Sequence, residues 1–113
     1  MKYIIAVIKP HRLENVKSEL ANAGVHLMTV VDALGCGRQQ GITEVYRGVK
    51  EVGNLLRKVK IEVGITEDFL EPAIEAIIKG AKEDLIGDGK IFVFNMEDCV
   101  RIRTGERGKI AIG

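Results

Sequence analysis

The chain has 113 residues, of which 46% are hydrophobic and 29% charged, and its formal net charge is +1. This length suits a single domain, residues 1–113, whose core needs no disulfide or structural metal to hold it together. The near-neutral charge excludes a global attraction to nucleic acid or to an anionic membrane, so any anion site must be a local cluster of charge.

The first third of the chain predicts a strand, a helix and a second strand. Residues 3–8 form an apolar run that suits a strand buried on both faces. A helical pattern opens at Pro10 and stops near Gly24. Its apolar side carries Leu13, Val16, Leu20 and Ala21. Residues 25–34 are β-branched and apolar enough to form the second strand.

Residues 37–54 have a different composition. They carry four glycines, few apolar side chains, mixed charge and no pattern of their own. Such a connection between two strands is far longer than the few residues that a hairpin needs. Polar loops of this length are usually functional or mobile.

The second half predicts a strand, a helix and a strand. Residues 55–65 alternate, with Val59, Ile61 and Val63 on one face. Residues 69–81 have the helical period, with Asp68 as a candidate N-cap and Pro72 in the first turn. The apolar helical positions are Leu70, Ala73, Ile74, Ile77, Ile78 and Ala81. Residues 90–94 are a fourth strand, and residues 100–103 extend the sheet.

This order of elements predicts an α+β, ferredoxin-like βαββαβ fold (a split βαβ), with a long loop between strands two and three. Two helices can cover only one face of such a sheet. Residues 3–8 and 91–94 are nevertheless apolar on both faces. The uncovered face therefore needs a partner, and the simplest partner is another copy of the chain.

The residues offer no support for catalysis. His11 and His26 have no acid or serine placed beside them, which favours surface or hydrogen-bonded histidines. Cys36 and Cys99 lie in no metal-ligand spacing and are expected to be small packing residues. The N-terminus reads as a strand and no apolar run approaches a bilayer-spanning length, which favours a soluble protein of the reducing cytoplasm.

Two segments favour anion binding. The run Gly87-Asp88-Gly89-Lys90 lies between a helix and a strand, where glycines let backbone N–H groups converge on an anion and the lysine adds charge. Arg101 and Arg103 project from one face if their segment is extended, and guanidinium groups bind phosphate oxygens bidentately. The alternatives are a plain tight turn and a charged edge strand.

A third cluster lies at the two ends of the long loop. Glycines at 35 and 37 permit close approach by a ligand, Arg38 supplies charge, and the neutral oxygen of Gln39 is a reasonable ligand for Mg²⁺. Lys58, at the other end, could pair with a carboxylate. The alternative is that all of these are exposed residues at the base of a loop.

The sequence resembles the PII family of nitrogen-signalling proteins over nearly its whole length. The segments that carry the resemblance are Ile8-Lys9-Pro10, Met28-Thr29-Val30, residues 35–39, Thr43-Glu44 with Tyr46-Arg47-Gly48, residues 58–62, residues 86–94 and residues 101–106.

The resemblance implies a homotrimer whose clefts between subunits bind ATP or ADP. The residues implied at the nucleotide are Thr29, Gly35, Gly37, Arg38, Gln39, Glu62, Gly64, Gly87, Asp88, Gly89, Lys90, and Arg101 and Arg103 from the neighbouring subunit. With Mg-ATP bound, 2-oxoglutarate also chelates the metal, and Gln39 completes that shell. The residues implied at 2-oxoglutarate are Gln39, Gln40, Gly41, Lys58 and Gly87.

The resemblance implies three loops: a long mobile one at about residues 37–54, a phosphate-binding one at about residues 82–90 and a C-terminal one at about residues 102–113. Ligand state sets the shape of the first loop, which then docks or fails to dock on a target. Tyr46 and Arg47 are the implied target contacts. The implied partners are an ammonium transporter, glutamine synthetase or another nitrogen-metabolism enzyme, with no nucleic acid and with a membrane met only through a transporter.

Several positions depart from the family pattern. Glu51 and Val49 stand where other members carry a modified tyrosine or serine, so we expect control by ligands alone. Glu83, Asp84 and Leu85 replace the usual Thr-Gly-Lys and add two acids beside the phosphate turn. Gln40 replaces a lysine and Gly64 replaces an aliphatic residue.

Two alternative functions remain. One is a PII-like sensor of a different nucleotide or of a metal, without a response to 2-oxoglutarate. The other is an enzyme on the same fold, such as a phosphotransferase, which would need an activated nucleophile near Lys90.

Overall fold

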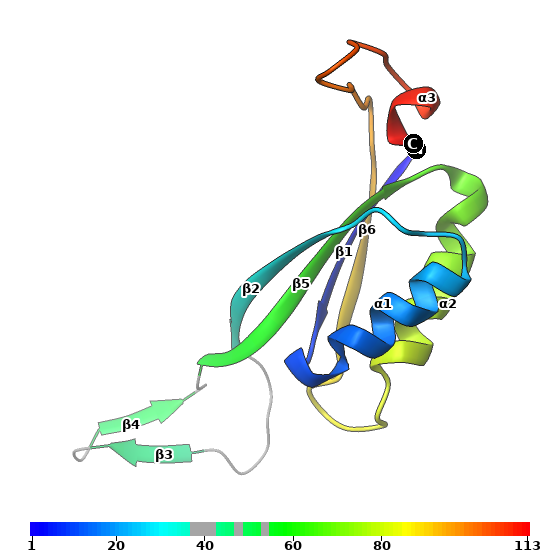
Figure 1. Ribbon diagram of the computed structural model, residues 1–113. Helices are drawn as coiled ribbons and strands as arrows, with labels where there is room; N and C mark the ends of the chain where they lie inside the picture. The colour runs from blue at the N-terminus through cyan, green and yellow to red at the C-terminus, as the bar shows by residue number, and fades with distance from the viewer. Residues whose placement is uncertain (37–42, 47–48, 53–54) are drawn as a thin grey trace.

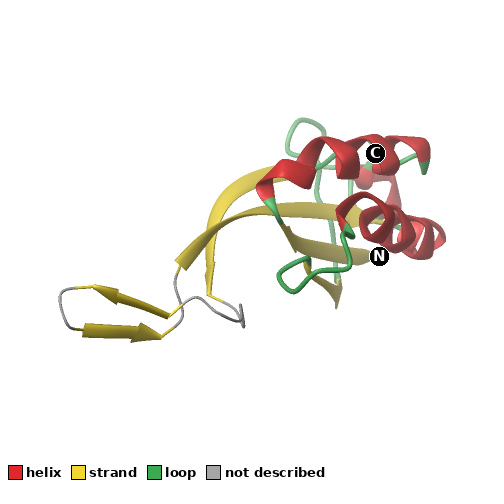
Figure 2. Cartoon of the chain, turned by 90° about the horizontal axis from the view of Figure 1, so that it is seen from below, coloured by secondary structure: helices red, strands yellow, loops and turns green. Residues whose placement is uncertain are grey.

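The computed structural model describes residues 1–36, 43–46, 49–52 and 55–113. Its elements in chain order are β1 (Lys2–Ile8), the 3₁₀ turn η1 (Pro10–Arg12), α1 (Leu13–Asn22), β2 (Thr29–Cys36), β3 (Thr43–Tyr46), β4 (Val49–Val52), β5 (Leu55–Ile65), the 3₁₀ turn η2 (Glu67–Phe69), α2 (Leu70–Ala81), β6 (Gly89–Asn95) and α3 (Lys109–Ile112). Four strands form an antiparallel sheet in the order β2-β5-β1-β6. Helices α1 and α2 both lie on one face of it (Figure 1, Figure 2). The predicted ferredoxin-like βαββαβ fold is confirmed.

The core lies between the sheet and the two helices. It is built from alternate positions of β1 and β5 and from the inner sides of α1 and α2, because only alternate strand residues face the helices. The predicted burial of one face of residues 55–65 is confirmed. Core residues include Ile4, Ala6, Ile8, Val16, Leu20, Val59, Ile61, Val63, Ala73 and Ile77.

The first helix ends as predicted, and the way it ends delays the second strand. Gly24 has φ +83°, and its N–H and that of Val25 bond back to the carbonyls of Ala21 and Leu20, at 3.0 and 2.8 Å. This is a glycine C-cap, in which the residue after the glycine packs back on the helix. Val25 is therefore buried in the core as part of the cap, and the strand begins at Thr29 rather than at Val25.

Three local predictions about the helices were wrong. Asp68 is not the N-cap of α2, because it lies inside η2; Phe69 holds the cap position and no side chain caps the helix. Ala21 and Ile78 were expected on the buried faces but are exposed, because each lies at the margin of its apolar stripe.

Part of the long connection has regular structure that its composition did not predict. Strands β3 and β4 pair antiparallel, with Thr43 opposite Val52 and Tyr46 opposite Val49. They form a separate two-stranded sheet that lies beyond the ends of β2 and β5 (Figure 1). The hairpin can form because backbone pairing needs no apolar pattern.

Residues 100–103 do not extend the sheet. Instead the chain folds back on itself: Val100 bridges to Arg107, and the N–H of Gly105 bonds to the carbonyl of Arg101 at 2.7 Å. Gly105, with φ +74°, supplies the left-handed residue that this turn requires. The prediction that residues 100–103 extend the sheet was therefore wrong, and the condition for Arg101 and Arg103 to share one face is not met.

The face of the sheet opposite the helices is apolar and exposed. The register sets Ile5 opposite Phe92 and Tyr3 opposite Phe94, so these side chains share that face. Phe92 and Phe94 are 46% and 49% exposed. No helix in the described part of the chain is both long and apolar enough to cross a membrane.

Candidate functional site

The Gly87–Lys90 run lies at one end of the sheet, where it leads into β6. Gly87 and Gly89 have φ of +96° and +114°, a region that other residues rarely adopt. A Cβ atom on Gly89 would lie 1.8 Å from the carbonyl oxygen of Val7, so the backbones of β1 and β6 can approach only because position 89 is glycine. The register places Lys90 opposite Val7, and therefore on the uncovered face of the sheet.

The side chain of Asp88 holds the turn together. Its Oδ2 accepts the N–H groups of Glu83 at 2.9 Å and of Leu85 at 3.3 Å, and its Oδ1 lies 3.3 Å from Nζ of Lys9. The hydrogen bonds from these backbone N–H groups, with a smaller contribution from Lys9, lower the pKa of Asp88. The turn is therefore fixed by an ionised carboxylate.

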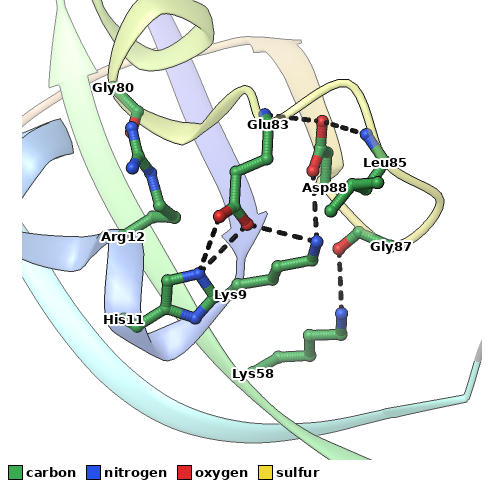
Figure 3. Close-up of polar contacts among 9 residues, drawn as sticks. All are labelled: Lys9, His11, Arg12, Lys58, Gly80, Glu83, Leu85, Gly87 and Asp88. Carbon is green, nitrogen blue, oxygen red and sulfur yellow. Dashed lines mark hydrogen bonds and ion pairs between the residues drawn. The ribbon is translucent and has the colours of Figure 1, made fainter.

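Lys9 and His11, which follow the neighbouring end of β1, also contact the turn, and sequence reasoning missed both. Nζ of Lys9 lies 3.2 Å from Oε1 of Glu83, and Nε2 of His11 lies 3.0 Å from both carboxylate oxygens of Glu83 (Figure 3). The hydrogen bond from His11, followed by that from Lys9, lowers the pKa of Glu83. Burial alone would lower the pKa of Lys9, but its bonds to Glu83 and Asp88 outweigh that and raise it.

This cluster gives the protein a defined sensitivity to acid. The pKa values of Asp88 and Glu83 are lower in the folded protein than in an unfolded chain, so the unfolded chain binds more protons in acid. The stabilisation is therefore present at neutral pH and is lost as the pH falls below about 4.

We accordingly expect the urea midpoint to change little from pH 7 to 5 and to drop between about pH 4 and 2. Asp88→Asn should have a lower midpoint at pH 7 and a smaller drop in acid. Glu75→Gln, on the exposed side of α2, is the control and should keep the wild-type profile. An undiminished acid drop in Asp88→Asn would contradict this assignment.

Lys58 reaches the same turn from β5. Its Nζ donates to the carbonyl oxygen of Gly87 at 3.0 Å (Figure 3). Gly35, on neighbouring β2, leaves room for the Lys58 side chain because it has no Cβ. A Cβ at position 35 would lie 3.0 Å from Cγ of Lys58. The structure thus brings together Gly35, Lys58 and the Gly87–Lys90 turn at one end of the sheet.

Thr29, Glu62 and Gly64 lie at the opposite end. Thr29 pairs with Glu62, and Gly64 pairs with Tyr3. Thr29, Glu62 and Gly64 line a cavity of about 340 Å³, together with Tyr3, Met96, Ala111 and Ile112 among others. The methyl group of Met96 lies 3.4 Å from where a Cβ of residue 64 would stand, so Met96 occupies space beside the glycine.

Arg101 and Arg103 belong to the segment that follows β6, and that segment lies at this second end of the sheet (Figure 1). Nη1 of Arg101 lies 2.9 Å from Oε1 of Glu106, and its Nη2 donates to the carbonyl of Ile110 at 2.9 Å. Arg103 is exposed. The full length of β6, about 20 Å, separates the two arginines from the Gly87–Lys90 turn of the same chain.

Other predicted positions lie outside the described residues. These are Gly37, Arg38, Gln39, Gln40, Gly41 and Arg47. Tyr46 ends β3, and Val49 and Glu51 belong to β4. Within the described residues no three histidine, cysteine or acidic side chains are grouped closely enough to hold a metal ion. Gln39, the predicted metal ligand, is among the residues outside the described part of the chain.

Comparison with known proteins identifies the family. Residues 1–106 match the family described as "Nitrogen regulatory protein P-II". A "Nitrogen regulatory protein P-II" of Mesorhizobium japonicum is 55% identical over 99% of this chain and 100% of its own length. "Nitrogen regulatory protein GlnK1" of Methanosarcina mazei is 49% identical over 99% of this chain and 97% of its own.

A solved structure is also similar. It is titled "Crystal Structure of Arabidopsis thaliana PII bound to citrate", and it matches with a TM-score of 0.79 and 35% identity. The match covers 98% of this chain and 88% of the other. Sequence and fold therefore agree along the same length, and the chain belongs to the P-II family of nitrogen regulatory proteins.

Proposed function

We propose that this protein is a trimeric, cytoplasmic signalling protein that binds ATP or ADP in clefts between subunits. The observation that carries the proposal is the division of the candidate residues between two ends of one sheet. Glycines and lysines gather at one end, and arginines and a cavity lie at the other, about 20 Å away. Phosphates bound by the first end can meet the arginines only of another copy.

The exposed apolar face supports the same assembly. Phe92 and Phe94, with Tyr3 and Ile5 opposite them, form a contiguous surface that a lone subunit would leave in water. A head-to-tail contact around a closed ring brings the turn of each subunit to the arginines of the next. Three such contacts make three equivalent clefts.

The second ligand in this proposal is 2-oxoglutarate, bound together with Mg-ATP. Lys58 supplies an ammonium group at the Gly87 carbonyl, where it can pair with the far carboxylate of the ligand. Gln39 and the phosphates would hold Mg²⁺, which bridges two anions that otherwise repel each other. The Arabidopsis relative is titled as bound to citrate, itself a carboxylate, which supports a carboxylate ligand here.

The output of the protein is binding rather than catalysis. Residues 37–54, which lie between Gly35 and Lys58, would dock through Tyr46 and Arg47 on an ammonium transporter or a nitrogen-metabolism enzyme. The names of the relatives, nitrogen regulatory proteins, support this class of target. With Glu51 and Val49 at the positions of the usual modified residues, ligands alone would set the state.

Calorimetry on the intact protein tests the proposal. We expect ATP and ADP to bind competitively, at one site per chain, with 2-oxoglutarate giving heat only when Mg-ATP is present. Sedimentation should give a trimer with and without ligand. Nucleotide binding without any 2-oxoglutarate heat would favour the alternative, a P-II-like sensor of a different nucleotide or of a metal that lacks a 2-oxoglutarate response. No nucleotide binding would reject the proposal.

A further inference from the structure

An acidic side chain is held against the proposed phosphate turn by two basic ones. The carboxylate of Glu83 lies between His11 and Lys9, with Oε1 3.0 Å from the imidazole Nε2 and 3.2 Å from the ammonium Nζ (Figure 3). The backbone N–H of the same residue donates to Asp88 inside the turn. Glu83 is thus tied to the turn by its main chain and to the end of β1 by its side chain.

This arrangement neutralises the ammonium group of Lys9, a cation beside the turn that could otherwise contact a bound anion's phosphates. Nζ of Lys9 contacts Asp88 at 3.3 Å as well as Glu83, so two carboxylates share one ammonium group. The side chains of Lys9 and Glu83 are only 16% and 25% exposed. Charges held in this way are screened by salt less than charges in open solvent.

We propose that Glu83 determines specificity in the nucleotide cleft. Its negative charge weakens the binding of the phosphate chain, more for ATP than for ADP. The inference rests on the proposed function, because it assumes that phosphates bind at residues 87–90.

The dependence on phosphate charge follows from Coulomb's law. The repulsion grows with the charge on the ligand, so the longer phosphate chain loses more affinity than the shorter one. Lys9 remains bonded to Asp88 when Glu83 is neutralised, but one fewer anion then competes for it. We expect a change of roughly threefold to tenfold in ATP affinity from one partly screened charge.

Two substitutions test the proposal by calorimetry. Glu83→Gln keeps the shape and removes the charge; it should tighten ATP binding roughly threefold to tenfold and ADP binding less. Asp84→Asn is the matched control, because it removes an equal charge from the adjacent residue, whose side chain is 79% exposed and paired with Lys82 instead. It should change ATP affinity by less than about twofold.

The outcomes separate the two proposals. Wild-type nucleotide binding with an unchanged ATP-to-ADP ratio in Glu83→Gln overturns the role of Glu83 and leaves the proposed function standing. Equal effects of Glu83→Gln and Asp84→Asn also overturn it, because general charge rather than the contact with Lys9 would then be the cause. Absence of nucleotide binding in the wild type removes both proposals together.

Discussion

Replacing Gly89 by alanine is expected to cost roughly 3–5 kcal/mol of folding free energy. The added Cβ would lie 1.8 Å from the carbonyl oxygen of Val7 and 3.0 Å from its carbonyl carbon. These are backbone atoms of β1, so the contact cannot be relieved by turning a side chain. The φ of +114° adds strain that alanine does not tolerate. The pairing of Ile8 with Gly89 must therefore break.

Urea unfolding followed by circular dichroism, at a fixed protein concentration, measures this loss. Gly105→Ala is the matched control, since Gly105 also has a positive φ, +74°, but its added Cβ would meet nothing within 4 Å. It should cost only the backbone strain, roughly 1–2 kcal/mol. Equal losses in the two variants would show that strain, and not the close approach of β1 to β6, limits position 89.

The second large effect that we expect concerns nucleotide binding. Substitutions at either end of the sheet should abolish it, and trimers that mix the two variants should recover part of it. Arg101→Ala with Arg103→Ala removes the charges at one end, and Lys58→Ala with Lys90→Ala removes them at the other. Each double variant alone should bind ATP at least a hundredfold more weakly than the wild type does. The reason is that it loses two cationic side chains that contact the phosphates or the groups beside them. Each should remain trimeric, since the apolar side chains Tyr3, Ile5, Phe92 and Phe94 of the uncovered face are unchanged.

Trimers that contain both variants should recover part of the binding. When the two chains carry different affinity tags and are co-expressed, purification over both tags leaves only mixed trimers. A mixed trimer holds two copies of one variant and one copy of the other. Whichever variant is doubled, about one cleft in three joins an intact turn to intact arginines. Calorimetry should therefore find about one ATP per mixed trimer, at wild-type affinity. No recovery would mean that each site lies within one chain or uses other residues.

The sheet and its covered face could be predicted from the sequence because their signals are local. Residues 55–65 were predicted as a strand from strict alternation, and β5 has those bounds, with Val59, Ile61 and Val63 buried. Gly24 was predicted to end the first helix, and it does so with a positive φ. Both signals are properties of a few neighbouring residues.

The contacts that the sequence could not predict join residues that are far apart in the chain. The contact between Lys9 and Glu83 joins residues 74 positions apart, and no sequence pattern near Lys9 indicates it. It does follow from topology, because β1 and β6 are antiparallel neighbours and the end of one meets the start of the other. The turn at Arg101 was missed since Gly105 and the bridge from Val100 to Arg107 reverse the chain.

The assignment of roles to the site residues remains a prediction. The structure places two groups of them, at the Gly87 end and at the Thr29 end of the sheet. Residues 37–42 lie outside the described part, so the predicted contacts of Arg38 and Gln39 rest on the sequence alone.

In the proposed trimer, the division of the candidate cleft between the two ends of one sheet would link sensing to protein abundance. In the proposed ring, a dissociated subunit has no complete cleft, so ligand and neighbouring subunits stabilise each other by mass action. Apparent nucleotide affinity should then fall on dilution below the range in which the ring holds together. A cell that makes too little of this protein would lose its signal at that threshold, even with nucleotide in excess.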